Sequence, residues 1–225
     1  MKTIIVSFGT NAALKISYPD QDDAKIESII ALISKNTLAV HLFVSLLAKM
    51  HALTVIFTDK SMTSKGTWFP ETRKIRIRNG LSVEESLQTL IFECCNAYNP
   101  RFADLKSNAF QTADDYAKYI EEGEHWSYTM AYKIYLHGIL HAAWPKPADV
   151  SKFEAALSKK TWMEKAKTKC SFYNGASSHF EIYTTYFNNK HPTAPKANDH
   201  LMARDPSNDH DQSDGLANIK IAGQK

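Results

Sequence analysis

The first quarter of the chain alternates between strand-like and helix-like hydrophobic patterns. Residues 3–8 and 12–18 form two strand-like runs around a Gly-Thr-Asn turn, which predicts a β-hairpin. Hydrophobic residues then recur at helical spacing over residues 22–34 and, with more apolar character, over residues 38–51. The short run LTVIF at residues 53–57 predicts a buried strand. These patterns indicate a sheet packed by helices.

A second strand signal follows a polar loop at residues 58–67. Residues 74–78 (KIRIR) alternate basic and hydrophobic side chains. In a strand, this alternation directs the isoleucines toward a core and the basic residues toward solvent or a cleft. Because lysine and arginine discourage pairing with another chain, we expect this strand to lie at the edge of the sheet.

Residues 81–100 (LSVEESLQTLIFECCNAYNP) predict a helix, with sequence signals for both its start and its end. Ser82, with Glu85 three residues later, has the capping-box pattern of a helix start. Pro100 disfavours helical backbone in the residue before it. One apolar stripe recurs at helical spacing and comprises Leu87, Leu90, Ile91, Cys94 and Tyr98.

The second half of the chain has mainly helical patterns. Residues 112–140 predict a long helix and residues 149–167 another amphipathic helix, whereas residues 180–187 fit either a strand or a helix. Residues 191–225 contain no aromatic residue and three prolines, so this tail buries too little apolar area to offset its ordering entropy. We therefore expect one α+β domain over residues 1–190, with a small mixed sheet packed by several helices, followed by a disordered tail.

The predicted helix at residues 82–98 carries Phe92, Glu93 and Asn96 on the side away from its apolar stripe. A strand, a short turn and a helix with a central glutamate are the layout of the zincin active-site helix, whose motif is HExxH. There, two histidines bind zinc and the glutamate takes a proton from the zinc-bound water. Over roughly residues 38–135 the chain resembles this metallopeptidase fold. It resembles in particular the compact zincin-like domains of bacterial effectors and polymorphic toxins.

The histidine positions depart from the motif of that family. Phe92 has no metal-binding atom, and Asn96 is a weak zinc ligand. The resemblance therefore implies a pseudo-metallopeptidase that acts by binding a partner protein rather than by proteolysis, with no cofactor. The candidate site residues are Glu93, Asn96 and Glu124. Glu124 belongs to the segment EEGEH at residues 121–125, where a third ligand would stand.

Two other functions stay open at this stage. An active hydrolase-type cleft would use Glu93 as general base, Asn96 to orient the substrate, and Glu124 or His125 as a helper. An interaction or immunity-type protein would have no active cleft and would act through its surface. In the simplest interpretation, Glu93 pairs with a neighbouring base on the helix surface and has no chemical role.

Histidines elsewhere give a weaker metal signal. His137 and His141 are separated by four residues near the end of the long helix, a spacing that can hold a metal ion. Histidines near a helix C-terminus are also favoured by the helix dipole, so a structural role explains them equally. Cys170 and His179 lie on either side of an Asn-Gly turn, and no third group in the sequence orients them.

The cysteines suggest packing more than catalysis. Cys94 lies on the apolar stripe and Cys95 at its margin, and the surrounding sequence matches no cysteine-protease signature. Three cysteines, two of them adjacent, leave at least one thiol free, which favours a reducing compartment. The N-terminus has one lysine and a short, broken apolar run, which is not the pattern of a signal peptide. We expect a cytoplasmic location at synthesis, and export without a cleaved signal stays open.

The composition fits a soluble globular protein, with 44% hydrophobic and 23% charged residues in a chain of 225. A net charge of +3, without a run of five like charges, gives no indication of nucleic-acid or membrane-surface binding. The sequence also has no run of about 18 apolar residues, which a membrane-spanning helix requires. The partner expected from sequence is therefore an unidentified protein.

Overall fold

The computed structural model describes residues 1–8, 13–58, 62, 64–103, 105–147, 150–168 and 177–192. The predicted disordered tail over residues 191–225, apart from its first two residues, lies outside these ranges.

Within the described residues, five strands form one mixed sheet in the order β1-β2-β3-β5-β4. The strands are β1 (Lys2–Val6), β2 (Ala13–Tyr18), β3 (Ala52–Thr58), β4 (Gly66–Phe69) and β5 (Lys74–Arg78). β1 pairs antiparallel with β2, which confirms the predicted hairpin. β2, β3 and β5 are parallel, and β4 is antiparallel to β5.

The predicted edge position of β5 is wrong, because β4 pairs along its outer side. β4 begins inside the segment predicted as a polar loop, and only four residues form it. The predicted alternation in β5 is confirmed: Ile75 and Ile77 are fully buried, and Arg76 is exposed. The Arg76 guanidinium lies over the Phe69 ring of β4, 5.0 Å from its centroid. The basic residues therefore marked the outer face of the strand and not an unpaired edge.

The helices follow the predicted order with two differences. The described α-helices are α1 (Asp23–Lys35), α2 (Thr37–Met50), α3 (Val83–Tyr98), α4 (Pro100–Ala103), α5 (Ala113–His141), α6 (Ser151–Ala156), α7 (Lys159–Ala166) and α8 (His179–Lys190). Three 3-10 turns are η1 (Asp20–Asp22), η2 (Pro70–Thr72) and η3 (Ser107–Ala109). The single helix predicted at residues 149–167 is instead α6 and α7, because Ser158 caps a new helix start. The ambiguous segment at residues 180–187 is helical, with its own capping box at Ser178 and Glu181.

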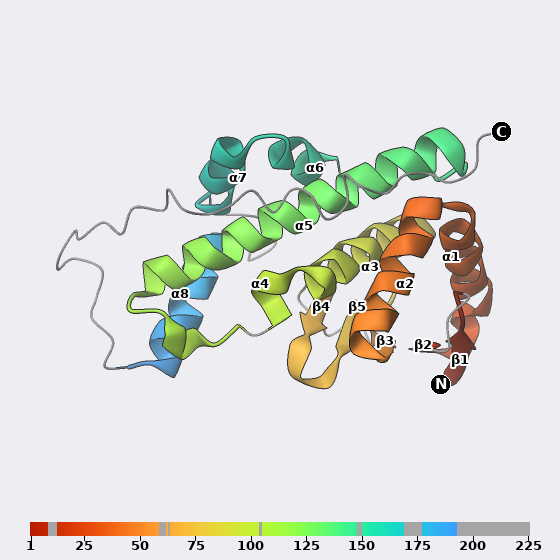
Figure 1. The fold of residues 1–225 in the computed structure, drawn as a ribbon, viewed down its shortest axis with the longest axis horizontal. Coiled ribbons are helices and arrows are strands. Elements are labelled where there is room, and N and C mark those ends of the chain that lie inside the picture. The colour runs from red at the N-terminus through yellow and green to blue at the C-terminus, as the bar shows by residue number, and fades with distance from the viewer. Residues whose placement is uncertain are drawn as a thin grey trace.

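α3 lies at the centre of the fold and contacts α1, α2, α5, β4 and β5 (Figure 1). Its predicted capping box is present, with the Glu85 N–H donating to Ser82 Oγ and the Ser82 N–H donating to the Glu85 carboxylate. Eleven of its 16 residues are buried. A helix covered on nearly all sides is a core helix, so the side opposite the apolar stripe is interior as well.

α5 runs along the molecule with α6 and α7 on one side and α8 on the other (Figure 1). A second hydrophobic cluster joins α4, α5 and α8 through Phe102, Tyr116, Ile120 and Phe187. Trp68 of β4 packs against this cluster and against the main core. The rim of the sheet and α8 are therefore linked through one set of apolar side chains.

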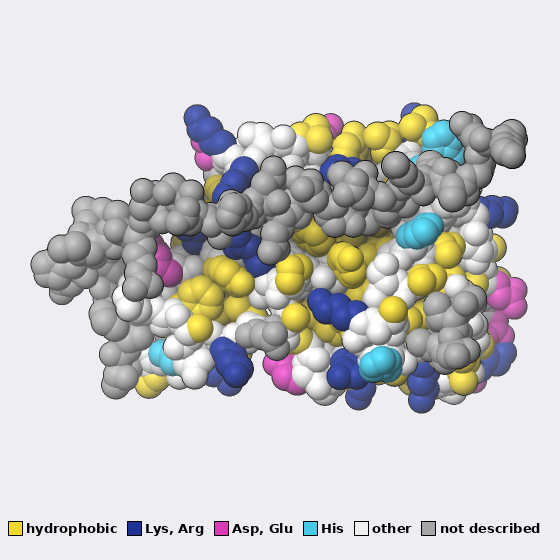
Figure 2. Space-filling view, viewed as in Figure 1, with side chains coloured by type: hydrophobic (Ala, Val, Ile, Leu, Met, Phe, Trp, Pro, Cys, Tyr) yellow, Lys and Arg dark blue, Asp and Glu magenta, His cyan; other side chains and the backbone are white. Residues whose placement is uncertain are grey.

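No single described helix is long and apolar enough to cross a bilayer. The segment of η1 and α1 satisfies the length and hydropathy criteria only together with α2, and the two are bent by 100° relative to one another. On the face shown in Figure 2, lysine and arginine side chains are dispersed among hydrophobic and uncharged groups.

Candidate functional site

Glu93 lies in the middle of α3 and is enclosed by the rim strand β4. Its side chain is 5% exposed. A Cβ atom at Gly66 would lie 3.0 Å from Glu93 Cγ, 3.1 Å from Glu93 Oε1 and 2.5 Å from Thr89 Cγ2. Only glycine leaves room for the β4 backbone to approach α3 this closely. The interpretation of Glu93 as a surface residue is therefore wrong.

Asn96 and Glu93 contact one another inside this enclosure. The Asn96 Nδ2 atom donates a hydrogen bond of 3.3 Å to Glu93 Oε2. Asn96 is 7% exposed, and its Oδ1 atom is buried without a hydrogen-bond partner, as is the indole Nε1 of Trp68. Buried polar atoms are usually paired, so each of these two atoms has unused hydrogen-bonding capacity.

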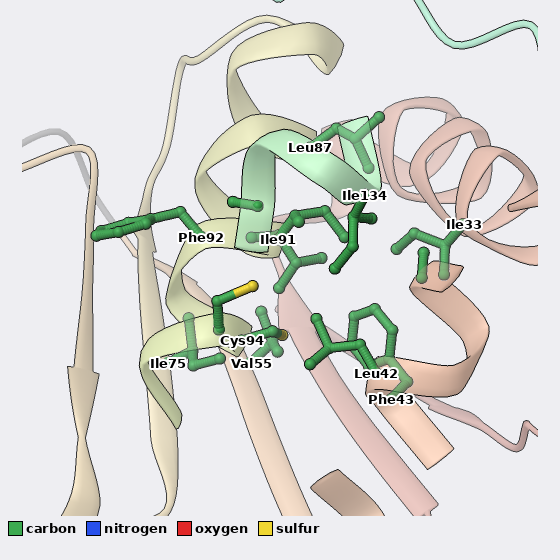
Figure 3. Packing of buried hydrophobic residues seen from close by; sticks show 14 of the residues in the cluster. Ile33, Leu42, Phe43, Val55, Ile75, Leu87, Ile91, Phe92, Cys94 and Ile134 are labelled. Carbon is green, nitrogen blue, oxygen red and sulfur yellow. The ribbon is translucent and has the colours of Figure 1, made fainter. Parts of the chain in front are cut away.

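Phe92, next to Glu93 in α3, belongs to an aromatic stack. Phe92 points away from the core side chains Ile91 and Cys94 (Figure 3). Its ring stacks on Tyr128 of α5, with the centroids 3.8 Å apart and the planes at 24°. Tyr128 contacts Trp162 of α7 at 5.0 Å between centroids. The stack links α3, α5 and α7.

Glu124 forms part of a second polar group, on the α8 side of α5. Its Oε1 accepts a hydrogen bond of 2.8 Å from Tyr183 Oη, and its Oε2 lies 3.8 Å from His179 Nδ1. Glu121, one turn earlier, is fully buried; its Oε1 lies 2.6 Å from His179 Nδ1, and its Oε2 accepts from Trp162 Nε1 at 3.1 Å. One potential ligand atom from each of Glu121, Glu124 and His179 lies within 4.8 Å of the others.

The two predicted carboxylates, Glu93 and Glu124, contact different parts of the structure. Those of Glu93 are with Asn96 and β4, and those of Glu124 are with α8. His125, the alternative helper, contacts the Ala156 carbonyl oxygen through Nε2 at 3.0 Å. Burial lowers the pKa of His125 and favours the neutral ring. His125 therefore connects α5 to α6.

His137 and His141 lie side by side, with their ring centroids 4.7 Å apart. His137 Nδ1 lies 3.0 Å from Oδ1 of the buried Asn36, whose Nδ2 donates to the Ile134 carbonyl. Burial and the adjacent His141 lower the pKa of His137. Among the described residues, a group of three potential metal ligands is present at Glu121, Glu124 and His179 and does not include this pair.

Both cysteines of α3 are interior. Cys94 is fully buried and Cys95 is 1% exposed, so Cys95 does not lie at the margin of the stripe. Burial raises the pKa of both thiols well above the usual range, and the adjacent Glu93 adds to this effect. Protonated, enclosed thiols are poor nucleophiles. Cys170, the other thiol of the chain, lies outside the described residues.

The sequence did not indicate Glu121 and His179 as partners. Glu121 and Glu124 share one face of α5 at i,i+3 spacing, which the sequence shows. His179 lies 58 residues from Glu121, and no spacing rule connects the two. The i,i+3 pair of Glu121 and Glu124 within a long helix is the local sequence feature that could have identified this polar group.

Fold and site together define an α+β protein in which a buried core helix carries a glutamate beneath an antiparallel rim strand. The chain matches no protein-family model, and comparisons with curated proteins and with solved structures also find no match.

Proposed function

We propose that this chain is a zincin-like domain that has lost its catalytic metal centre and acts by binding a partner protein. The layout that supports the proposal begins with β5, a short turn and the capping box at Ser82. It continues with α3, where Glu93 lies mid-helix beneath β4, and with α5 packed along α3. A strand over residues 74–78, a short turn and a helix with a central glutamate are the order that the resemblance implies, whereas the covering strand β4 is not part of it.

The observation that carries the proposal is the stacking of Phe92 on Tyr128 beside an enclosed Glu93. A catalytic zinc site needs three protein ligands and an open position for water. Here an aromatic ring from α3 occupies the first ligand position and a second ring from α5 lies against it at 3.8 Å. The neighbouring carboxylate is 5% exposed. Phe92 and Asn96 therefore leave Glu93 without the histidine ligands that hold a catalytic zinc ion in a zincin, and the Glu93 carboxylate is enclosed.

The first test compares wild-type protein with Glu93→Gln in hydrolysis of an unstructured protein such as casein, with excess zinc present. The substitution keeps the size of the side chain and its hydrogen bond to Asn96. We expect no cleavage by either protein, and we expect Glu93→Gln to retain any partner that the wild-type chain binds. Cleavage by wild-type protein that Glu93→Gln abolishes would refute the proposal and support an active hydrolase cleft.

The second test restores the missing ligands. The double variant Phe92→His and Asn96→His recreates the two histidines at i and i+4 around Glu93. If α3 is a zincin-type helix, this variant should bind one more equivalent of zinc than wild-type protein. The matched control Phe92→His and Cys95→His has the wrong i,i+3 spacing and should gain none. A folded double variant with the same zinc content as wild type would refute the zincin-like assignment.

One observation favours the alternative of an active cleft. The buried Asn96 Oδ1 of α3, next to Glu93, lacks a hydrogen-bond partner, which fits a small polar ligand or a water molecule bound at this atom. In that function Glu93 is the general base and Asn96 orients the substrate. It requires β4 to move away from Thr89 and Glu93, so activity would depend on opening of the rim strand.

A further inference from the structure

We propose that Glu121, Glu124 and His179 form a binding site for a divalent transition-metal ion that links α5 to α8. This group is separate from the Phe92 and Asn96 positions, where a zincin would bind zinc. Its donors are two carboxylate oxygens and one imidazole nitrogen, a set that suits zinc and similar ions. The ligand atoms lie within 4.8 Å of one another.

The orientation of the two carboxylates supports this assignment. Each has one oxygen held by a donor from a neighbouring helix and the other directed at His179 Nδ1. Trp162 Nε1 donates to Glu121 Oε2 at 3.1 Å, and Tyr183 Oη donates to Glu124 Oε1 at 2.8 Å. Such outer hydrogen bonds are typical of metal ligands, because they fix which oxygen faces the ion.

Burial and charge also favour a cation. Glu121 is fully buried, and its described partners are an indole N–H and the imidazole of His179. The adjacent Glu122, by contrast, pairs with Arg101 at 3.1 Å and Lys159 at 2.9 Å. A carboxylate removed from water needs a compensating charge. A divalent ion held by Glu121 Oε1 and His179 Nδ1 would supply such a charge.

The distances allow metal entry with a small local change. The 2.6 Å separation between His179 Nδ1 and Glu121 Oε1 is a hydrogen-bond distance, with a proton between the two atoms. Two ligands of a tetrahedral zinc ion lie about 3.3 Å apart, and His179 Nδ1 is already 3.8 Å from Glu124 Oε2. The Glu121 and Glu124 ligand atoms lie within 4.8 Å, so loss of the proton and a closure of at most about 1.5 Å, shared between the two side chains, create the site. The side chains of His179 and Glu124 are 27% and 12% exposed, so the group lies near the protein surface on that side.

The test is calorimetric titration of the chelator-treated, full-length chain with zinc chloride at about pH 7.5, where an unperturbed imidazole is mostly neutral. We expect one equivalent to bind with a dissociation constant of about 10 μM or tighter. At 100-fold excess over that constant, zinc should raise the unfolding temperature by about 5 °C. His179→Gln and Glu124→Gln should each weaken binding by about 100-fold or more, because each removes a direct ligand.

Two control variants separate this site from its neighbours. Glu122→Gln changes an adjacent carboxylate that pairs with Lys159 and Arg101, and the double variant His137→Gln and His141→Gln removes the other histidine pair. Both should bind zinc as the wild type does. Absence of zinc binding by wild-type protein up to about 1 mM would show that the group is an ion pair only. Binding that survives His179→Gln and Glu124→Gln, or that is lost with the His137 and His141 pair, would also overturn the proposal.

Discussion

At the scale of single residues, buried amide side chains hold the helices around α3 together. Asn99, 2% exposed, donates from Nδ2 to the Gly123 carbonyl at 2.9 Å and accepts the Arg101 N–H at Oδ1 at 3.0 Å. One side chain therefore joins the end of α3 to the middle of α5 and starts α4.

We expect Asn99→Ala to lower the free energy of unfolding by about 2–3 kcal/mol, because it removes both hydrogen bonds of a buried amide, leaves the Arg101 N–H without its acceptor and opens a small cavity. Urea denaturation measures the loss. Asn108 is exposed in η3, and Asn108→Ala is the matched control, with an effect below about 0.5 kcal/mol. Equal stability of the two variants would contradict this role of Asn99.

The α3 thiols should be chemically silent in the folded protein. In a Cys170→Ser background, Cys94 and Cys95 should react with a disulfide reagent such as DTNB at least about 100-fold more slowly than in urea-unfolded protein. The reason is that both thiols are buried and burial raises the pKa of each. A fast-reacting thiol in the native protein would revive the cysteine-nucleophile hypothesis.

Glu85 gives a pH-dependent contribution to stability. The Lys65 ammonium, 3.0 Å from the carboxylate, and the Ser82 N–H lower the pKa of Glu85. A carboxylate with a lowered folded-state pKa stabilises the protein above its unfolded pKa, and this contribution disappears as the pH falls through the folded value.

Wild-type protein should therefore exceed Glu85→Gln in unfolding free energy by about 0.5–1 kcal/mol at pH 7. The difference should shrink as the pH falls below about 4.3, the unfolded value, and should be lost once the pH has passed through the lowered folded-state pKa of Glu85. Urea denaturation at several pH values measures it. In a Lys65→Met background the difference at pH 7 should shrink, and a difference independent of pH would exclude the ion pair as its source.

At the scale of elements, the contact between β4 and α3 depends on the missing side chain of Gly66. A Cβ atom at this position would lie 2.5 Å from Thr89 Cγ2 and 3.0 Å from Glu93 Cγ. Gly66 therefore determines how closely the rim strand covers Glu93.

We expect Gly66→Ala to destabilise the protein by about 1–3 kcal/mol through this overpacking. Thr89→Ser removes Cγ2, so the cost of Gly66→Ala should fall by about 1 kcal/mol in that background. A double-mutant cycle of unfolding free energies measures the coupling. Additive effects of the two substitutions would show that β4 and α3 are not in the described contact.

At the scale of the whole molecule, the described α8 is held by its own packing on α5. Phe187 is 1% exposed in the second hydrophobic cluster, and His191 Nε2 lies 2.9 Å from Ser107 Oγ. α8, the last described helix, therefore belongs to the folded domain.

We expect a chain ending at Pro192 to unfold within about 2 °C of the full chain, because residues 193–225 have too little apolar content to add a core. Differential scanning calorimetry measures the two transitions. The shortened chain should also retain any partner protein that the full chain binds. A large fall in the unfolding temperature would place residues 193–225 within the folded unit.

The sequence by itself determined the elements with strong local signals: the hairpin of β1 and β2, the capping box of α3, and the long α5. Such signals depend on neighbouring residues and on helical or strand periodicity, so no tertiary information is needed to interpret them. The same local reasoning predicted one helix where the structure has two, α6 and α7. The apolar pattern continues through Ser158, so it conceals the helix start that this residue caps.

Only the tertiary structure decided which side chains share an environment. The sequence showed Glu93 opposite an apolar stripe, but its burial results from β4, a four-residue strand too short to be recognised by pattern. It showed Glu121 and Glu124 on one face of a helix, but their contact with His179 depends on the packing of α8 across 58 residues of chain. Long-range contacts of this kind arise from the burial of whole faces and not from residue spacing, and the candidate sites of this protein lie at those contacts.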